Sequence, residues 1–238
     1  MRDPPAQLFP RLTTLAKLFA ADYWIVLDDV QFTRRDYQHR ARLAALDDPR
    51  SWQWLSIPTH LPAGRRTTIR EALIVDPMRS RRRTMQMIRQ YFGSSPHWST
   101  LAHAMDPVLE LFATTDKTAE VAEVSTGILL NLLGWKGRIL RSSQLASRPG
   151  RSQRLADLAA ITAARSYLCG TGGMSYLEND LFTSRGITVT PFRTPTAGVW
   201  DSGRAISALR ALMVLGPPTL ADALRAVAAD QGALRAAA

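Results

Sequence analysis

The sequence is poor in two residue types, with one cysteine and three lysines among 238 residues. A single thiol, Cys169, excludes an internal disulfide and a zinc site built from cysteines. No apolar run is long enough to span a bilayer, and the first residues contain no apolar stretch of signal-peptide type. We therefore expect a cytoplasmic protein with no membrane span.

Histidine is also scarce, and its four positions are scattered. No spacing among these histidines and the acidic residues matches a metal site, and His97 and His103 are six apart rather than three or four. We expect no metal ion and no cofactor.

The net charge of +10 raises the question of a nucleic-acid partner. Arginine supplies nearly all of the basic residues and alanine is abundant, which is typical of a high-GC genome. The basic residues are dispersed, apart from a run at 79–83, and the aromatic residues are not interleaved with them on one strand face, as a stacking platform requires. The sequence therefore favours a small anionic substrate, such as a phosphate or carboxylate, over nucleic acid.

The apolar pattern predicts a single α/β domain over residues 1–238. A helix at 12–21 and a strand at 23–27 are followed by strands at 52–58 and 69–76 and by a helical insertion at 77–134. A strand at 138–141, a helix at 152–164 and a strand at 166–170 read as a parallel βαβ unit. A strand at 187–190 and a C-terminal helical segment at 201–236 complete a mostly parallel sheet flanked by helices.

The first candidate cluster is "VLDDVQFTRRDYQHRARL", which begins at the end of a buried strand. Carboxyl ends of strands border the ligand crevice in open α/β sheets, and neighbouring residues of a strand point to opposite faces. We expect Asp29 to face a cleft, with Asp28 held by backbone amides or by an arginine. The alternative is a strand exit where both acids pair with Arg34 or Arg35.

The same cluster contains one histidine among arginines. Neighbouring positive charges lower the pKa of His39 and leave it a neutral base near pH 7, while the arginines can bind a phosphate or carboxylate bidentately. His60, beside a strand end and a basic turn, is a second candidate base. The alternative for this cluster is a polar loop with one exposed imidazole.

The second candidate cluster is "LCGTGGMSYLE", where a strand runs into three glycines and then a helical pattern. The glycines would let backbone amides approach an anion at a helix N-terminus, although neither the dinucleotide fingerprint nor the P-loop pattern is present. Cys169 at the strand end is a candidate nucleophile. The alternative is a small buried residue that fills the strand.

Both clusters resemble the WbqC-like protein family over about residues 8–216. Positions matching the first family block are Pro10, Asp22, Asp28, Asp29, Val30, Gln31, Phe32, His39 and Arg40; those matching the second are Tyr167, Leu168, Gly170, Gly172, Gly173, Tyr176 and Leu177. The resemblance also implies a short first strand where this chain has Pro4 and Pro5. Either the natural start lies further upstream or that strand is lost.

The resemblance implies a bacterial tailoring enzyme of polysaccharide (O-antigen type, lipopolysaccharide) or natural-product biosynthesis. We expect it to transfer an acyl or aminoacyl group to a small amine or sugar; the alternatives are a non-covalent transferase on a nucleotide-activated substrate and a non-catalytic small-molecule-binding protein. The substrate is expected to be anionic or carrier- or nucleotide-activated. The candidate catalytic residues are Asp29, His39, His60 and Cys169. The candidate substrate-binding residues are Asp28, Gln31, Arg35, Tyr37, Arg40, Gly170, Gly172, Gly173 and Tyr176.

Overall fold

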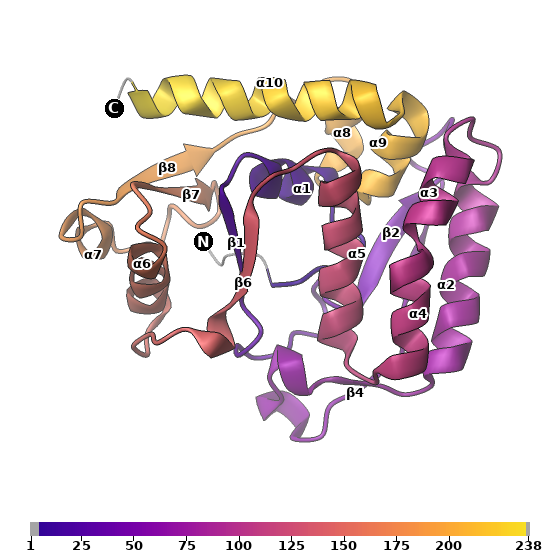
Figure 1. Ribbon diagram of the computed structural model, residues 1–238, viewed down its shortest axis with the longest axis horizontal. Coiled ribbons are helices and arrows are strands. Elements are labelled where there is room, and N and C mark those ends of the chain that lie inside the picture. The colour runs from indigo at the N-terminus through magenta and orange to yellow at the C-terminus, as the bar shows by residue number, and fades with distance from the viewer. Residues whose placement is uncertain (1–4, 237–238) are drawn as a thin grey trace.

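The computed structural model describes residues 5–236 and shows a mixed α/β protein (Figure 1). Its α-helices are α1 (Leu12–Phe19), α2 (Pro77–Phe92), α3 (Trp98–Ala104), α4 (Asp106–Thr114), α5 (Thr118–Leu132), α6 (Arg151–Ile161), α7 (Asp180–Thr183), α8 (Val199–Gly203), α9 (Ala208–Leu215) and α10 (Pro217–Ala236). Its strands are β1 (Tyr23–Val26), β2 (Arg40–Ala44), β3 (Trp52–Ser56), β4 (Thr59–His60), β5 (Leu73–Ile74), β6 (Arg138–Arg141), β7 (Ser166–Gly170) and β8 (Thr188–Phe192).

The described strands form four separate pairs rather than one sheet. Two pairs are parallel, β1 with β6 and β7 with β8; the pairs β2–β3 and β4–β5 are antiparallel. The α/β class is therefore confirmed, but a mostly parallel sheet is not evident. Helix α6 connects β6 to β7 as expected, yet each of these strands pairs with a different partner, so they do not form the predicted βαβ unit with each other.

The main hydrophobic core lies where α1, α5, α9 and α10 pack around β1 and β2. Figure 1 shows α10 along one side over α1, α8 and α9, with α2, α4 and α5 running beside one another. Phe9, Trp24 and Phe92 are among its fully buried side chains. Burial of each such side chain contributes roughly 1.5–3 kcal/mol, so this cluster provides most of the stability.

A second, smaller core lies under the pair β7–β8 and holds α6 and α7 against it. Tyr167 of β7 stacks on Phe182 of α7, with ring centroids 5.0 Å apart. Leu155 and Leu158 of α6 fill the space on the other side. This core fixes the strand ends from which the glycine-rich segment leaves.

Two segments differ from the sequence-based expectation. Residues 40–44, where no strand was expected, form strand β2, because Ala41 and Leu43 alternate with arginines and are fully buried. The strand expected at 69–76 instead begins with a 3₁₀ turn, Ile69–Glu71, opened by a capping box between Thr68 and Glu71. Only Leu73–Ile74 is extended there.

The helical insertion is confirmed. Helix α2 ends before Gly93, and the chain breaks at Met105, between α3 and α4. Helix α5 begins after Lys117 without a side-chain cap. The first strand that the resemblance implies would span Pro4 and Pro5; Pro4 lies outside the described residues, and residues 5–7 form no strand.

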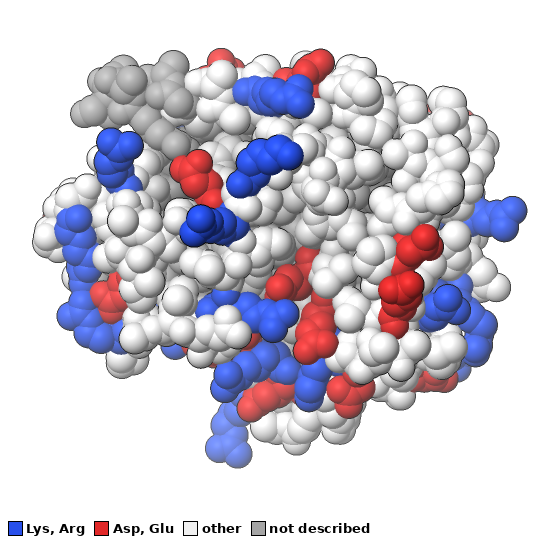
Figure 2. All heavy atoms as spheres, viewed as in Figure 1, with Lys and Arg blue, Asp and Glu red and all other residues white. Residues whose placement is uncertain are grey.

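Charged residues are interspersed on the face drawn in Figure 2, where blue and red side chains alternate rather than gather by sign. This view agrees with the dispersed pattern in the sequence. None of the helices within residues 5–236 combines the length and the apolar character needed to cross a bilayer.

Candidate functional site

A cleft of about 870 Å³ lies at the carboxyl ends of β7 and β8. In the strand register Gly170 is opposite Phe192, so the segments that follow both strands leave the pair at the same edge. The cleft is lined by Pro5, Gln7, Arg11, Thr13, Thr14, Lys17, Asp36, Gly170, Thr171, Gly172, Gly173, Tyr176, Phe192, Arg193, Thr194, Thr196 and Arg204. This is the edge at which parallel α/β pairs bind ligands.

The glycine-rich segment forms one wall of the cleft as a series of turns. The Gly173 amide donates to the carbonyl of Gly170 (2.8 Å), and the Tyr176 amide donates to Gly173 (3.2 Å). Helix α7 begins only at Asp180 and is four residues long, so the expected helix N-terminus directly after the glycines is not formed. A side chain added at Gly172 would meet no atom within 4 Å, which leaves this point of the wall open.

Positive charge dominates the lining. Arg11, Arg193 and Arg204 line the cleft, and none of the three forms an ion pair within the part of the chain that the structure describes. One Arg11 nitrogen donates to the carbonyl of Arg204 (3.2 Å). Asp36 supplies the carboxylate of the lining. An anion entering the cleft therefore meets guanidinium groups that no described acid neutralises.

Two polar atoms at the cleft wall have no hydrogen-bond partner among the described residues: Oε1 of Gln7 and Nε of Arg11. Gln7 is 5% exposed, so its amide is almost completely removed from bulk solvent. Buried polar groups are nearly always hydrogen-bonded, and exceptions cluster at functional sites.

The paired acids lie at the carboxyl end of β1. Asp28 is nearly buried and accepts from the Ser143 amide (3.0 Å) and the Ser143 hydroxyl (2.6 Å). The expectation that backbone amides hold Asp28 is therefore confirmed. Asp29 accepts from Ser142 Oγ (2.5 Å) and from the Arg154 guanidinium (3.3 Å); the alternative pairing with Arg34 or Arg35 is not formed.

Helix α6 connects the two candidate clusters through its first turns. Arg154 pairs with Asp29, while the Arg151 guanidinium lies 4.7 Å over the ring of Tyr176 in the glycine-rich wall. Between them, Ser152 Oγ accepts from the Glu178 amide (3.2 Å). Asp29 of the first cluster and Tyr176 and Glu178 of the second thus contact the same helix.

His39 has the neutral state expected from its neighbours. Burial, together with the charges of Arg40 and Arg34, lowers the pKa of His39 to about 4. Its ring is tilted against Phe32, with centroids 5.3 Å apart, and its Nδ1 has no partner in the described residues. His39 does not line the cleft.

The other predicted residues that do not line the cleft include Asp28, Asp29, Gln31, His60 and Cys169. Cys169 is completely buried in the second core, and its thiol donates to the Gly170 carbonyl (3.5 Å). His60 is exposed in β4, where it pairs with Leu73, and Gln31 donates to the carbonyl of Arg65 (2.6 Å). The structure therefore brings together the glycines and Tyr176, but not the two candidate bases or the thiol.

The first cluster contributes to the cleft mainly through residues that the sequence did not single out. Asp36 lines the cleft, and the predicted Tyr37 beside it lies under the Arg11 guanidinium at 4.4 Å. Tyr37 also donates to the Ala205 carbonyl (3.4 Å), next to Arg204. Arg193 could have been found from the sequence, because it directly follows strand β8 at the edge where ligands bind. The expected strand at 187–190 ended two residues before the observed one, so Arg193 was not placed at the strand end.

Two further predicted residues, Arg40 and Arg35, lie beside this wall. The Nε and one terminal nitrogen of Arg40 donate to the carbonyls of Asp36 (3.1 Å) and Arg35 (2.5 Å). Arg40 thereby holds the turn that carries Asp36. Arg35 itself is exposed.

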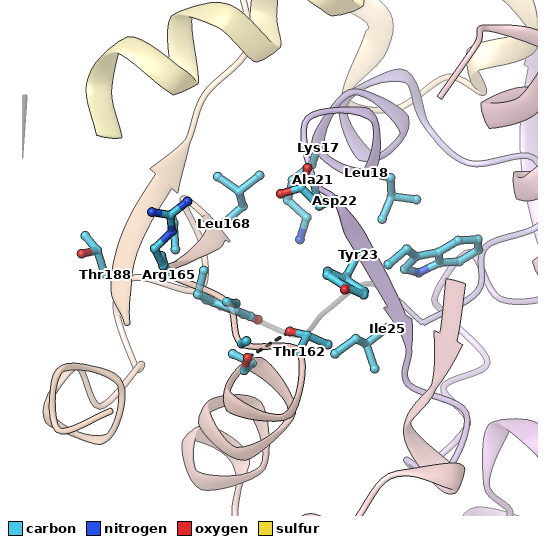
Figure 3. Close-up of a pocket in the computed structure, with 16 residues that line it drawn as sticks. Lys17, Leu18, Ala21, Asp22, Tyr23, Ile25, Thr162, Arg165, Leu168 and Thr188 are labelled. Carbon is cyan, nitrogen blue, oxygen red and sulfur yellow. Dashed lines mark hydrogen bonds between the residues drawn. The ribbon is translucent and has the colours of Figure 1, made fainter. Parts of the chain in front are cut away.

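A second cavity, of about 640 Å³, lies between β1 and β7 (Figure 3). Lys17 and Tyr23 point into it from one side and Leu168 from the other. Lys17 also lines the cleft at the strand ends, so the two hollows share this residue. We take the cleft as the candidate site because it contains the glycine-rich wall and the arginines without acid partners.

Metal ligands do not gather in the described residues: no three His, Cys, Asp or Glu side chains lie close enough together to hold an ion.

Comparison with known proteins gives a family and one uncharacterized relative. The profile of the WbqC-like protein family matches residues 6–204. An uncharacterized protein of Mycobacterium tuberculosis, Rv1507c, is 26% identical over 173 residues, which cover 72% of each chain. No solved structure matches the chain.

Proposed function

The chain belongs to the WbqC-like protein family, and on this premise we propose that it is a small-molecule transferase of bacterial polysaccharide or natural-product biosynthesis. The cleft at the ends of β7 and β8 binds the phosphate or carboxylate of its substrate. The transferred group is acyl or aminoacyl and its acceptor is a small amine or sugar hydroxyl, as the family resemblance implies. The biosynthetic setting also rests on that resemblance.

One observation carries the anion-binding part of this proposal. The open wall at Gly172 faces a lining with Arg11, Arg193 and Arg204, and these arginines have no acid partner among the described residues. Guanidinium groups bind carboxylate and phosphate bidentately, and such charge-assisted hydrogen bonds are about twice as strong as neutral ones. A cleft of this composition selects anionic ligands over neutral ones of the same size.

Asp36 is our candidate for the group that binds or deprotonates the acceptor. It is the carboxylate of the cleft lining, and the Arg40 side chain holds the turn that carries it. A carboxylate at hydrogen-bond distance from an amine or hydroxyl can take its proton as the new bond forms. Asp29 acts on the site indirectly, through Arg154 and helix α6.

Transfer without a covalent enzyme intermediate fits the position of Cys169 better than thiol catalysis does. The thiol is completely buried and donates to the Gly170 carbonyl, so no substrate carbon can reach it without opening the second core. We therefore favour direct transfer from an activated donor, such as a nucleotide- or carrier-linked one. A binding protein without catalysis is the second candidate, because the two candidate bases His39 and His60 do not line the cleft.

The binding part is tested by thermal unfolding with pyrophosphate, sugar nucleotides, acyl-CoA and uncharged sugars as separate probes. A ligand at a hundred times its Kd stabilises the protein by about 2.7 kcal/mol, which raises the Tm of a chain of this size by about 5–10 °C. We expect anionic probes alone to give this shift. The shift is expected to disappear in Arg204→Ala and to persist in Arg50→Ala, which removes one exposed arginine outside the cleft. Equal shifts from the uncharged sugars would refute an anion site.

The catalytic part is tested with Asp36→Asn. We expect this variant to keep the anion-induced shift and to lose most of its turnover of the best-binding donor. If Asp36→Asn turns over the donor at the wild-type rate, the carboxylate has no catalytic role. If neither protein turns over any bound donor, the binding-protein candidate replaces the transferase.

A further inference from the structure

The outer face of the β2–β3 hairpin carries arginines and tryptophans in alternation. In the antiparallel register Arg42 is opposite Trp54, Ala44 is opposite Trp52 and Arg40 is opposite Ser56. We name Arg40, Arg42, Trp52 and Trp54 the arginine–tryptophan face. The sequence did not reveal this interleaving, because it arises across two paired strands rather than on the face of one strand.

The side chains of this face are stacked on one another. The Arg40 guanidinium lies 4.2 Å over the Trp54 ring, and the Arg42 guanidinium lies 4.5 Å over Trp52 and 4.8 Å over Trp54. The two indole rings meet edge to face, with centroids 6.0 Å apart. Stacking of this kind holds the guanidinium planes in place before any ligand arrives.

The positive charge of the face has no described counter-charge. Neither Arg40 nor Arg42 forms an ion pair within residues 5–236. Arg40 donates to two backbone carbonyls, whereas the Arg42 side chain makes no hydrogen bond in that part of the chain, and its Nε is buried without a partner. No acceptor among the described residues therefore competes with an anion for the Arg42 guanidinium. Trp52 ends the stack and is 41% exposed, which leaves ring surface for another planar group.

We infer that the arginine–tryptophan face binds a nucleotide, whose base stacks on Trp52 and whose phosphate accepts hydrogen bonds from Arg42. A planar group with a phosphate attached satisfies both features of the face: aromatic side chains stack bases of any sequence, and arginine binds phosphate bidentately. Binding at this face goes beyond the proposed function and does not depend on it, because it can be measured while the cleft is disabled.

The face is continuous with the cleft. The Tyr37 ring lies 5.5 Å from Trp54, and Arg11, stacked over Tyr37 at 4.4 Å, lines the cleft. A donor activated by a nucleotide would therefore have its nucleotide anchored beside the cleft that receives the transferable group. This assignment of the donor class, nucleotide-activated rather than linked to a carrier without a base, rests on the proposed function, whereas the nucleotide site itself does not.

The inference is tested by titrating the protein with AMP and with ribose 5-phosphate while following tryptophan fluorescence. We expect AMP to quench the fluorescence and to bind about tenfold more tightly than ribose 5-phosphate, which carries the phosphate without the base. Trp52→Ala is expected to remove this tenfold difference, and Trp52→Phe to restore most of it. Arg42→Ala is expected to weaken both ligands by about tenfold. Arg50→Ala, in the turn of the same hairpin, is the matched control for loss of one positive charge and is expected to change neither affinity.

Several results would overturn the inference. Equal affinity for AMP and ribose 5-phosphate in the wild-type protein would show that the base does not stack on the protein. Unchanged AMP affinity in Trp52→Ala would show that the base binds at some place other than Trp52. A single-stranded oligonucleotide that binds a hundredfold more tightly than AMP identifies a nucleic-acid surface instead. The cleft variant Arg204→Ala separates the two proposals: loss of pyrophosphate binding with intact AMP quenching supports both sites, whereas loss of both ligands together indicates one anion site in the cleft and no nucleotide site on the hairpin. Circular dichroism confirms that each variant is folded.

Discussion

The pH dependence of stability provides a sharp test of the environment of His39. Burial and the neighbouring arginines lower its pKa from 6.5 to about 4 in the folded protein, while the unfolded chain keeps the ordinary value. Between these two pKa values the unfolded state binds more protons than the folded state. The free energy of unfolding therefore falls as the pH falls from 6.5 towards 4.

The size of this effect follows from the two pKa values. One pKa unit corresponds to 1.36 kcal/mol, so the difference between the two pKa values corresponds to about 3 kcal/mol in the free energy of unfolding. Partial exposure of the ring screens its neighbours' charges, and we reduce the expected contribution to about 2 kcal/mol. The stabilising contribution of neutral His39 is present above pH 6.5 and is lost as the pH approaches 4.

The assay is urea unfolding at pH 7.5 and pH 4.5 for the wild-type protein and for His39→Gln, which keeps a polar side chain that does not titrate in this range. We expect the wild-type protein to lose about 2 kcal/mol more than the variant between the two pH values. The acidic residues titrate equally in both proteins and cancel in the difference. His60→Gln is the control, because its imidazole is exposed, and it should retain the wild-type dependence. An unchanged pH dependence in His39→Gln would refute the buried, neutral histidine.

Three further predictions concern the structure around the site. Asp28→Ala should destabilise the fold by about 3 kcal/mol in urea unfolding, because it leaves the buried Ser142 hydroxyl and the part-buried donors of Ser143 without this acceptor, whereas Asp29→Ala should cost about 1 kcal/mol; the reverse order would contradict the described hydrogen bonds. Cys169 should react with a thiol reagent only after unfolding, so stoichiometric modification of the native protein on mixing would contradict its burial. Gly172→Ala should leave the Tm unchanged, whereas Gly137→Ala, whose new carbon would lie 2.1 Å from the Trp135 ring, should lower it by more than 5 °C.

Much of the secondary structure could be predicted because it follows from local patterns. Apolar spacing located α1, α2 and α5, and short apolar runs located β1 and β7. Strand β2 was missed because its two arginines face outward and its buried positions, Ala41 and Leu43, were too few to stand out in a basic segment. Strand pairing was the weakest point, since no local pattern indicates that β6 pairs with β1 and β7 with β8.

The candidate site was predicted only in part, because only some of its residues belong to a local sequence pattern. The glycine-rich segment is visible in the sequence because three glycines occur within four residues, and it does line the cleft. Arg11, Asp36 and Arg204 carry no signal in the sequence; they meet only because the segments before α1, before β2 and after α8 converge at the strand ends. The burial of Cys169 likewise depends on the packing of α6 and α7, which spacing alone does not reveal.

The most direct test of the central claim is a crystal structure of the protein with pyrophosphate. We predict electron density for the anion in the cleft at the ends of β7 and β8, within hydrogen-bond distance of Arg204 and at least one of Arg11 and Arg193. An empty cleft at a pyrophosphate concentration that saturates binding in solution, or density bound only elsewhere on the surface, would contradict the claim that this cleft is the anion-binding site.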